Sequence, residues 1–280
     1  MNSITTRAGR IAYTDQGDGP PIVMLHATLH DHHDYDAIVE PLARHHRVIA
    51  IDWPGHGESQ SPPPALEVTA PLLAGVFDDL MTELDLGSVV IIGNSVGGFV
   101  AARFALDHPG LVAGLVLVNA AGFQKQSVVT RQFCRTLGRP SIARAVVPRL
   151  VPRYMRPISS LDGQITERAT ALARTKQGAR TAAALWRSFS WPDYDLREHA
   201  AELRAPTLLV WGADDPVIPL EAGQQTNQMI LGSTLVGMAT GHVPFSSQPD
   251  VFLDHVEPFI AGAFGFPGAP VRTSPDETTG

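Results

Sequence analysis

Short apolar runs rich in β-branched residues alternate along the chain with longer segments in which apolar residues recur at helical spacing. The runs lie at 21–26, 47–52, 88–93, 114–119, 206–212 and 233–238, and helical spacing is clearest at 70–84, 97–108 and 250–263. Parallel strands need long crossover connections, which are usually helices. The pattern therefore predicts an α/β fold with a mostly parallel central sheet flanked by helices. The segment RAGRIAYTDQG at 7–17 predicts an antiparallel hairpin at the sheet edge.

The pattern changes between residues 122 and 203, where helical, arginine-rich sequence replaces the strands. Between Lys125 and Arg187 lie 13 basic and two acidic residues, a balance of +11, while the rest of the chain has 8 basic and 26 acidic residues, a balance of −18. A long strand-free insertion between two strands of one sheet is most simply a helical cap over the strand ends. We expect a core at 1–121 and 204–264, a cap at 122–203 and, from its Gly, Pro and Thr content, a flexible tail at 265–280.

Composition narrows the class of protein. A hydrophobic content of 44% and a charged content of 18% are values of a globular protein with a sizeable core. The polar start MNSITTRAGR lacks the apolar run of a signal peptide, and no stretch resembles a membrane span, so we expect a cytoplasmic protein without membrane association. The single cysteine, Cys134, excludes an internal disulfide. The acidic core and the absence of a recognisable nucleic-acid module argue against nucleic-acid binding.

A serine lies where one predicted strand runs into a helix. The run at 88–93 continues into GNSVG, a G-x-S-x-G pattern with Ser95 at its centre, and small residues open the helix that follows. Such a strand–turn–helix holds a serine on a strained turn with its hydroxyl exposed. A serine hydroxyl becomes a good nucleophile when a base takes its proton and an acid orients that base. Loops after the last two predicted strands supply such groups, Asp214 and Asp215 in the first and His242 in the second.

Several motifs, taken in their order, resemble the α/β-hydrolase-fold family over about residues 4–122 and 204–263. They are DWPGHGES at 52–59, GNSVG at 93–97, WGADDPVIP at 211–219 and GHVPFSSQPDVF at 241–252. The resemblance implies a triad of Ser95 as nucleophile, Asp215 as acid and His242 as base. Its W-G-x-x-D spacing selects Asp215 over Asp214. Some relatives place the acid after the sixth strand, near Asn119 here, which carries no charge.

The stretch LHATLHDHHDYD at 25–36 holds four of the chain's eleven histidines and three aspartates. At this position α/β-hydrolases carry a His-Gly-x loop whose backbone N–H forms half of the oxyanion hole, and His26, Ala27 and Thr28 resemble it with Ala in place of Gly. The resemblance implies that the backbone N–H groups of Thr28 and Val96 are the oxyanion donors. A metal site formed by the histidines and aspartates at 30–34 is the alternative, but consecutive residues do not easily converge on one ion. We therefore predict an oxyanion loop and no metal.

The predicted cap offers candidates for substrate binding. Arg131 and Arg135 share a helix face at i, i+4 spacing, and Trp186 and Trp191 belong to the aromatic stretch LWRSFSWPDY at 185–194. Arginine suits carboxylates and phosphates, and aromatic rings suit a pocket roof. The alternatives are a solvated face for the arginines and core packing for the tryptophans.

These observations predict a cofactor-independent serine hydrolase that cleaves an ester-type bond of a small molecule through an acyl-enzyme. The segments GNSVGG at 93–98 and VLVNAAGF at 116–123 resemble the subgroup that hydrolyses carbon–carbon bonds of ring-fission diketones, which is the first alternative. A weakly catalytic small-molecule receptor on the same fold is the second, because fold does not decide function. The basic cap leads to the hypothesis that the substrate is anionic or linked to an anionic carrier.

Overall fold

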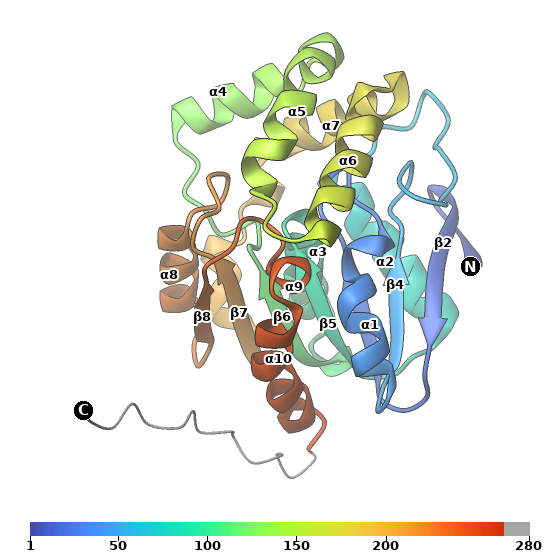
Figure 1. The fold of residues 1–280 in the computed structure, drawn as a ribbon, viewed down its shortest axis with the longest axis vertical. Helices are drawn as coiled ribbons and strands as arrows, with labels where there is room; N and C mark the ends of the chain where they lie inside the picture. The colour runs from blue at the N-terminus through green and yellow to red at the C-terminus, as the bar shows by residue number, and fades with distance from the viewer. Residues whose placement is uncertain (266–280) are drawn as a thin grey trace.

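The computed structural model describes residues 1–265 and builds them around one eight-stranded sheet (Figure 1). The strands are β1 (Asn2–Thr6), β2 (Gly9–Gln16), β3 (Pro21–Leu25), β4 (Arg47–Ile51), β5 (Val89–Asn94), β6 (Val112–Val118), β7 (Thr207–Gly212) and β8 (Thr234–Met238). Their order across the sheet is β1-β2-β4-β3-β5-β6-β7-β8. The β1–β2 and β2–β4 pairs are antiparallel and the other pairs are parallel. The six apolar runs are all strands of this sheet, so the predicted fold class is confirmed. An antiparallel hairpin lies at the sheet edge as expected, but it is formed by β1 and β2, and the segment 7–17 covers only its turn and second strand.

Helices cover both faces of the sheet (Figure 1). They are α1 (Asp36–Ala43), α2 (Ala70–Leu84), α3 (Val96–Asp107), α8 (Leu220–Met229), α9 (Pro244–Ser247) and α10 (Pro249–Ala263). Side chains alternate along a strand, so each strand serves two layers. In β5, Ile91 packs in the cluster that contains α2 and α3, whereas Val90 and Ile92 pack in the cluster that contains α1 and α10. This two-sided burial explains why the strands read as continuous apolar runs.

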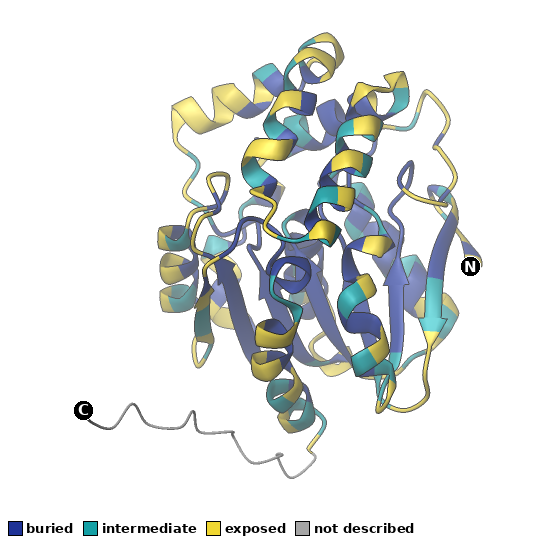
Figure 2. Cartoon of the chain, in the orientation of Figure 1, coloured by how far each residue is buried: buried dark blue, intermediate teal, exposed yellow. Residues whose placement is uncertain are grey.

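Four helices form the insertion between β6 and β7, and we call them the cap. They are α4 (Val128–Leu137), α5 (Pro140–Met155), α6 (Ser160–Arg174) and α7 (Lys176–Ser188). They lie above the carboxyl ends of the parallel strands (Figure 1), and their outer faces are exposed while the central strands of the sheet are buried (Figure 2). Polar side chains start three of these helices, α4, α6 and α7: Ser127, Ser159 and Thr175 each accept a hydrogen bond from the first turn.

Three ion pairs join the cap to the core. Arg156 lies 3.6 Å from Asp214, Arg168 lies 3.4 Å from Asp31, and Arg187 pairs with Glu67. Part of the predicted positive charge of the cap therefore meets acidic residues of the core. The division of the chain at 121/122 and 203/204 stays a prediction, and the predicted tail lies, apart from Gly265, outside the described residues.

The sequence also led to expectations about membrane spans and about the single cysteine. Within residues 1–265, none of the helices is both long and apolar enough to cross a membrane. Cys134 is a free, buried thiol on α4, and burial raises its pKa to about 11, which makes it a packed thiol rather than a nucleophile.

Candidate active site

Ser95 occupies the turn between β5 and α3 with φ 55° and ψ −116°, a backbone conformation that residues other than glycine rarely adopt. The turn is held by its backbone, because the Ser95 N–H donates to Val118 O at 3.0 Å and its carbonyl accepts from Ala121 N at 3.0 Å. The glycine of GNSVG after the serine is needed for close packing: a Cβ on Gly97 would lie 2.1 Å from Leu25 O. The predicted strained turn is therefore present, with Ser95 only half-buried at the carboxyl end of β5.

Asp215 and His242 come from the loops after β7 and β8 and meet below the cap. His242 Nδ1 lies 2.6 Å from Asp215 Oδ2, and both side chains are buried. The other carboxylate oxygen, Oδ1, accepts backbone hydrogen bonds from Val217 at 2.8 Å and Ile218 at 3.3 Å. Since an ionised carboxylate only accepts, Nδ1 donates to Asp215, and the neutral form of this tautomer keeps a lone pair on Nε2. This is the protonation state that a general base requires.

Asn94 ties the base loop to the nucleophile turn. It directly precedes Ser95, and its buried amide Nδ2 donates to His242 O and to Val118 O, both at 3.0 Å. One side chain thus joins β5, β6 and the loop that carries the imidazole. Sequence reasoning assigned Asn94 no role, although its place beside the nucleophile was a usable signal.

Asn119 is the second site residue that sequence reasoning missed. Its Nδ2 donates to Asp215 Oδ2 at 2.6 Å, and its Oδ1 accepts from Gly212 N at 3.0 Å. The residue has φ 41°, a left-handed conformation that asparagine tolerates better than most residues. The sequence marked Asn119 only as an uncharged residue at the end of β6, whereas its amide holds the acid from the neighbouring strand.

Asp214 points away from this constellation. It is exposed, and it pairs with Arg156 of the cap at 3.6 Å. Of the two adjacent carboxylates, the structure therefore brings Asp215 and not Asp214 to the imidazole.

The loop after β3 begins next to the nucleophile turn, because Leu25 at the end of β3 pairs with Gly93 of β5. His26 is buried and bonded on both ring nitrogens: Nδ1–H donates to Ala27 O at 2.7 Å, and Nε2 accepts from Trp53 N at 2.9 Å. His26 is thus a loop-holding residue, as its position suggested. The amides of Thr28 and Val96 have no hydrogen-bond acceptor among the described residues, which is what an oxyanion donor needs before substrate binds.

A second buried histidine fixes the next turn of this loop. Leu29 has φ 70°, and its N–H donates to His56 Nε2 at 3.0 Å. Burial lowers the pKa of His56 to about 4, and burial together with the nearby His56 lowers the pKa of His26 well below its ordinary value. Both imidazoles are therefore neutral at pH 7 and act as hydrogen-bonding parts of the backbone framework.

The remaining histidines of this stretch form separate pairs with carboxylates. His30 lies 2.6 Å from Asp34, His32 3.0 Å from Asp52, and His33 2.9 Å from Asp36. Among the described residues, no group of three or more His, Cys, Asp or Glu side chains is arranged to hold a metal ion. Burial alone would lower the pKa of His32, but the hydrogen bond and charge of Asp52 outweigh it and raise that pKa.

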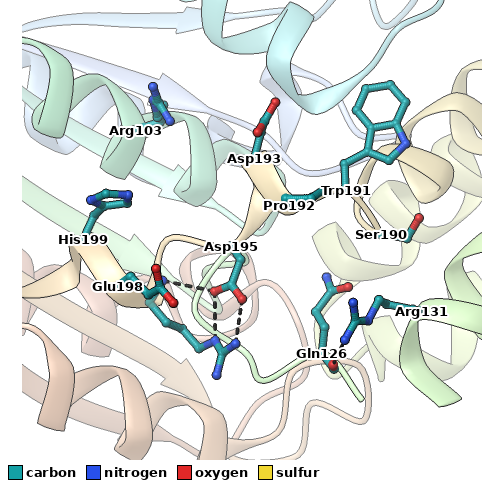
Figure 3. A pocket seen from close by; sticks show the side chains of 11 residues that line it. Arg103, Gln126, Arg131, Ser190, Trp191, Pro192, Asp193, Asp195, Glu198 and His199 are labelled. Carbon is teal, nitrogen blue, oxygen red and sulfur yellow. Dashed lines mark hydrogen bonds and ion pairs between the residues drawn. The ribbon is translucent and has the colours of Figure 1, made fainter. Parts of the chain in front are cut away.

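The four cap residues predicted to bind substrate lie in different surroundings. Arg131 and Trp191 line an open, polar cavity of about 380 Å³ (Figure 3), whose lining includes none of Ser95, Asp215 and His242. Arg135 is exposed and outside the cavity lining. Trp186 packs between Phe133 and Phe189, with ring centroids 5.7 and 5.5 Å away, in an aromatic row of the cap. The structure therefore brings Arg131 and Trp191 together in one cavity, whereas Arg135 and Trp186 lie outside its lining.

Known proteins share this architecture. A family model described as alpha/beta hydrolase fold matches residues 20–249. The 2-hydroxy-6-oxo-2,4-heptadienoate hydrolase of Pseudomonas putida is 31% identical over 93% of this chain and 99% of its own, and an uncharacterized protein of Mycobacterium tuberculosis is 30% identical over 91% and 80%. A thermophilic esterase from Thermogutta terrifontis, 25% identical, superposes with a TM-score of 0.80 over 94% of this chain and 98% of its own. With the family model covering most of its length, the chain belongs to the α/β-hydrolase fold family.

Proposed function

We propose that the protein is a serine hydrolase that cleaves esters of small molecules through an acyl-enzyme on Ser95. The observation that carries this proposal is the 2.6 Å bond between His242 Nδ1 and Asp215 Oδ2. It directs the Nε2 lone pair of His242 away from the acid, and Asn94 connects this imidazole loop to the turn that bears Ser95. A buried imidazole that is oriented by a carboxylate, in a loop that Asn94 joins to a strained serine turn, fits nucleophilic catalysis better than simple ligand binding.

The proposed reaction has two halves. Ser95 Oγ attacks the ester carbonyl while His242 Nε2 takes its proton, and Asp215 stabilises the resulting imidazolium. The Thr28 and Val96 N–H groups bind the oxyanion, His242 returns the proton to the leaving alcohol, and the acyl group stays on Ser95. Water, deprotonated by His242, then attacks the acyl-enzyme, and the acid is released as His242 returns that proton to Ser95 Oγ.

Carbon–carbon bond hydrolysis is the second candidate. It is supported by the 31% identity to a hydrolase whose name specifies 2-hydroxy-6-oxo-2,4-heptadienoate, over nearly the whole of both chains. That substrate is a carboxylate, which agrees with the hypothesis of an anionic substrate. We propose Arg131 and Trp191, which share a cavity, as the cap residues that contact such a substrate, with Arg135 and Trp186 as less direct candidates.

Substrate turnover by the purified protein tests the function. We expect many turnovers per molecule on short-chain aryl esters, measured by the release of the aryl alcohol. Ser95→Ala should lose this activity. A clear preference for a 2-hydroxy-6-oxo-dienoate would select the second candidate over the ester. Labelling of Ser95 by a phosphonate without turnover of either substrate would instead show a receptor-like protein and contradict the proposal.

A further inference from the structure

Tyr154, near the end of α5, is a cap residue that contacts both loops of the candidate active site. Its carbonyl accepts a hydrogen bond from His242 N at 3.2 Å, and its ring meets the His242 ring edge to face, with centroids 5.3 Å apart. Its hydroxyl lies 3.1 Å from His30 Nε2, in the loop that carries Thr28. The cap therefore reaches the proposed base through the backbone and ring of Tyr154, and the proposed oxyanion loop through its hydroxyl.

His30 is held on its other side by a buried carboxylate. Its Nδ1 lies 2.6 Å from Asp34 Oδ2, and the two side chains are 0% and 1% exposed. Burial raises the pKa of Asp34, and the neighbouring His30 opposes that rise. This pair is unlike those of His32 and His33, because only His30 contacts a cap side chain that also touches His242.

Counting donors and acceptors gives one proton arrangement that satisfies all three groups. If His30 Nδ1–H donates to Asp34, then Nε2 accepts the proton of the Tyr154 hydroxyl. If Nε2 carried the proton, it would donate to the tyrosine oxygen, and the hydroxyl proton would have no acceptor among the described residues. A buried donor without an acceptor is costly, so the first arrangement is favoured.

The contacts from Tyr154 through His30 to Asp34 restrain the backbone just before His30. Thr28, Leu29 and His30 are consecutive, and Leu29 has φ 70°, so anchoring the His30 ring restrains the peptide that presents the Thr28 N–H. A second cap residue, Arg168 on α6, lies 3.4 Å from Asp31 in the same loop. The loop is thus attached to two cap helices at positions just after the proposed oxyanion donor.

We propose that Tyr154 is a positioning residue through which the cap aligns the oxyanion loop, by way of His30, with the base His242. The inference rests on the proposed hydrolase function for its kinetic consequence. It makes the cap part of the catalytic alignment rather than only a cover, because displacing α5 would break the hydroxyl contact to His30 and the backbone contact to His242 together.

Two substitutions remove the link with little change in shape. Tyr154→Phe deletes the hydroxyl and keeps the ring against His242, while His30→Asn keeps a group near the Nδ1 position for Asp34 and loses the reach to Tyr154. We expect each to lower kcat by about tenfold with KM changed by less than about twofold, because misplaced catalytic groups cost rate rather than ground-state binding. The double variant should be no slower than either single variant, since both break one link.

Tyr35→Phe is the matched control. Tyr35 is fully buried where Tyr154 is half-buried, and the Tyr35 hydroxyl likewise makes one hydrogen bond, to Leu25 O at 2.8 Å. The Tyr35 ring packs on Phe245 rather than on His242. Tyr35→Phe should lower the melting temperature about as much as Tyr154→Phe but leave kcat within about twofold. Equal kcat losses in Tyr35→Phe and Tyr154→Phe, or losses that multiply in the Tyr154→Phe/His30→Asn double variant, would overturn the proposal.

A spectroscopic measurement makes the proposal testable without turnover. The Nδ1 protons of His30 and His242, each in a 2.6 Å bond to a carboxylate, should give separate proton NMR signals downfield of the amides. Assignment uses His30→Asn and His242→Ala. Tyr154→Phe should shift both signals, and Tyr35→Phe neither. If the wild type turns over no ester but both signals shift in Tyr154→Phe, the proposed function fails and the positioning role stands. If the His242 signal does not move in Tyr154→Phe, the positioning role is refuted whatever the activity.

Discussion

Ser95 and Asn119 both have positive φ, 55° and 41°, at the ends of the neighbouring strands β5 and β6. Such conformations cost about 1–3 kcal/mol each and persist only where the surroundings hold them. Here the surroundings are specific: the Ser95 amide is bonded to Val118 of β6, and the Asn119 side chain bridges Gly212 and Asp215 after β7. At the scale of single residues, strain is therefore concentrated where the chemistry is proposed.

The triad residues should act as a unit. Ser95→Ala and His242→Ala should each lose on the order of 10³-fold or more in kcat, and the double variant should be little worse, because removing either one disables the same proton transfer. Steady-state kinetics on an aryl ester, with folding checked by circular dichroism, measures this. Losses that multiply would mean that the two residues act independently.

The two adjacent carboxylates should differ sharply. Asp215→Asn keeps the side-chain shape but replaces the acceptor of the His242 Nδ1 proton with an amide that can favour the wrong tautomer, so kcat should fall by about 10²-fold or more. Asp214→Asn removes only an exposed ion pair to Arg156 and should leave kcat within about twofold. The reverse order would show that Asp214 is the acid.

Asn119 offers a test that the sequence did not suggest. Asn119→Leu leaves the buried Gly212 N–H without an acceptor and removes one of the donors to Asp215 Oδ2. It also forces a branched side chain into a left-handed conformation. The free energy of unfolding should fall by about 2 kcal/mol or more, and kcat should fall as well. Urea unfolding and ester kinetics measure both, with Asn227→Ala on α8 as a control that should change neither the activity nor the Asp215 environment.

Among the elements, α4 and the segment after α7 form the cavity that contains Arg131 and Trp191. Within it Arg197 is already paired with Asp195 at 2.6 Å. In contrast, no carboxylate among the described residues pairs with Arg131, which lies in the same cavity (Figure 3). The Arg131 guanidinium donates only to Gln126 O, at 3.3 Å, among the described residues, and we propose it as the cap group that meets an anionic ligand. The exposed arginines of α5, such as Arg144 and Arg149, line no part of this cavity.

Arg131 should contribute to selectivity if the substrate is anionic. We expect Arg131→Gln to lower kcat/KM for an acidic ester by about 1.5–3 kcal/mol while its neutral isostere is nearly unaffected, since a charged hydrogen bond is lost. Arg144→Gln, which removes the same charge elsewhere on the cap, is the matched control and should affect both esters little. Equal losses on the acidic and neutral esters would leave Arg131 as structural charge.

For the whole molecule, electrostatics links the cap, the oxyanion loop and stability. Three cap arginines pair with core carboxylates, and the oxyanion loop rests on the neutral, buried histidines His26 and His56. A histidine whose pKa is lower in the folded than in the unfolded protein binds its proton more readily on unfolding. Acidification therefore lowers the free energy of unfolding through His26 and His56. His32 opposes this effect in part, because its raised pKa favours the folded state below about pH 6.5.

Stability should fall as the pH is lowered from about 6.5 to 4. In this window the unfolded protein takes up the His56 proton that the folded protein, with that pKa at about 4, does not. The shift corresponds to about 3 kcal/mol of unfolding free energy, and His26 adds in the same direction. Urea unfolding at several pH values should show this slope, flattened in His56→Gln and unchanged in His255→Gln, an exposed control. A slope that is the same in both variants would remove His56 as its cause.

The strands, the hairpin, the inserted helices and the turn at Ser95 followed from the sequence because each depends on neighbouring residues. Apolar runs, glycine spacing and helix caps act over a few positions, so their pattern can be read directly. The choice between Asp214 and Asp215 also rested on local spacing. In contrast, the roles of Asn94 and Asn119 depend on hydrogen bonds to residues 148 and 96 positions away, which no local pattern reveals.

The tertiary structure also separated residues that the sequence had grouped. The histidines at 30–33 look alike in sequence, yet His30 reaches Tyr154, 124 positions away, while His32 reaches Asp52 and His33 only Asp36. Likewise Arg131 and Trp191 share a cavity that Arg135 and Trp186 do not line. The sequence by itself determined the order of strands and helices along the chain and the residue types at each strand end. Which of those side chains meet was decided only by packing, because burial selects partners by proximity in space and by the need to satisfy every hydrogen bond.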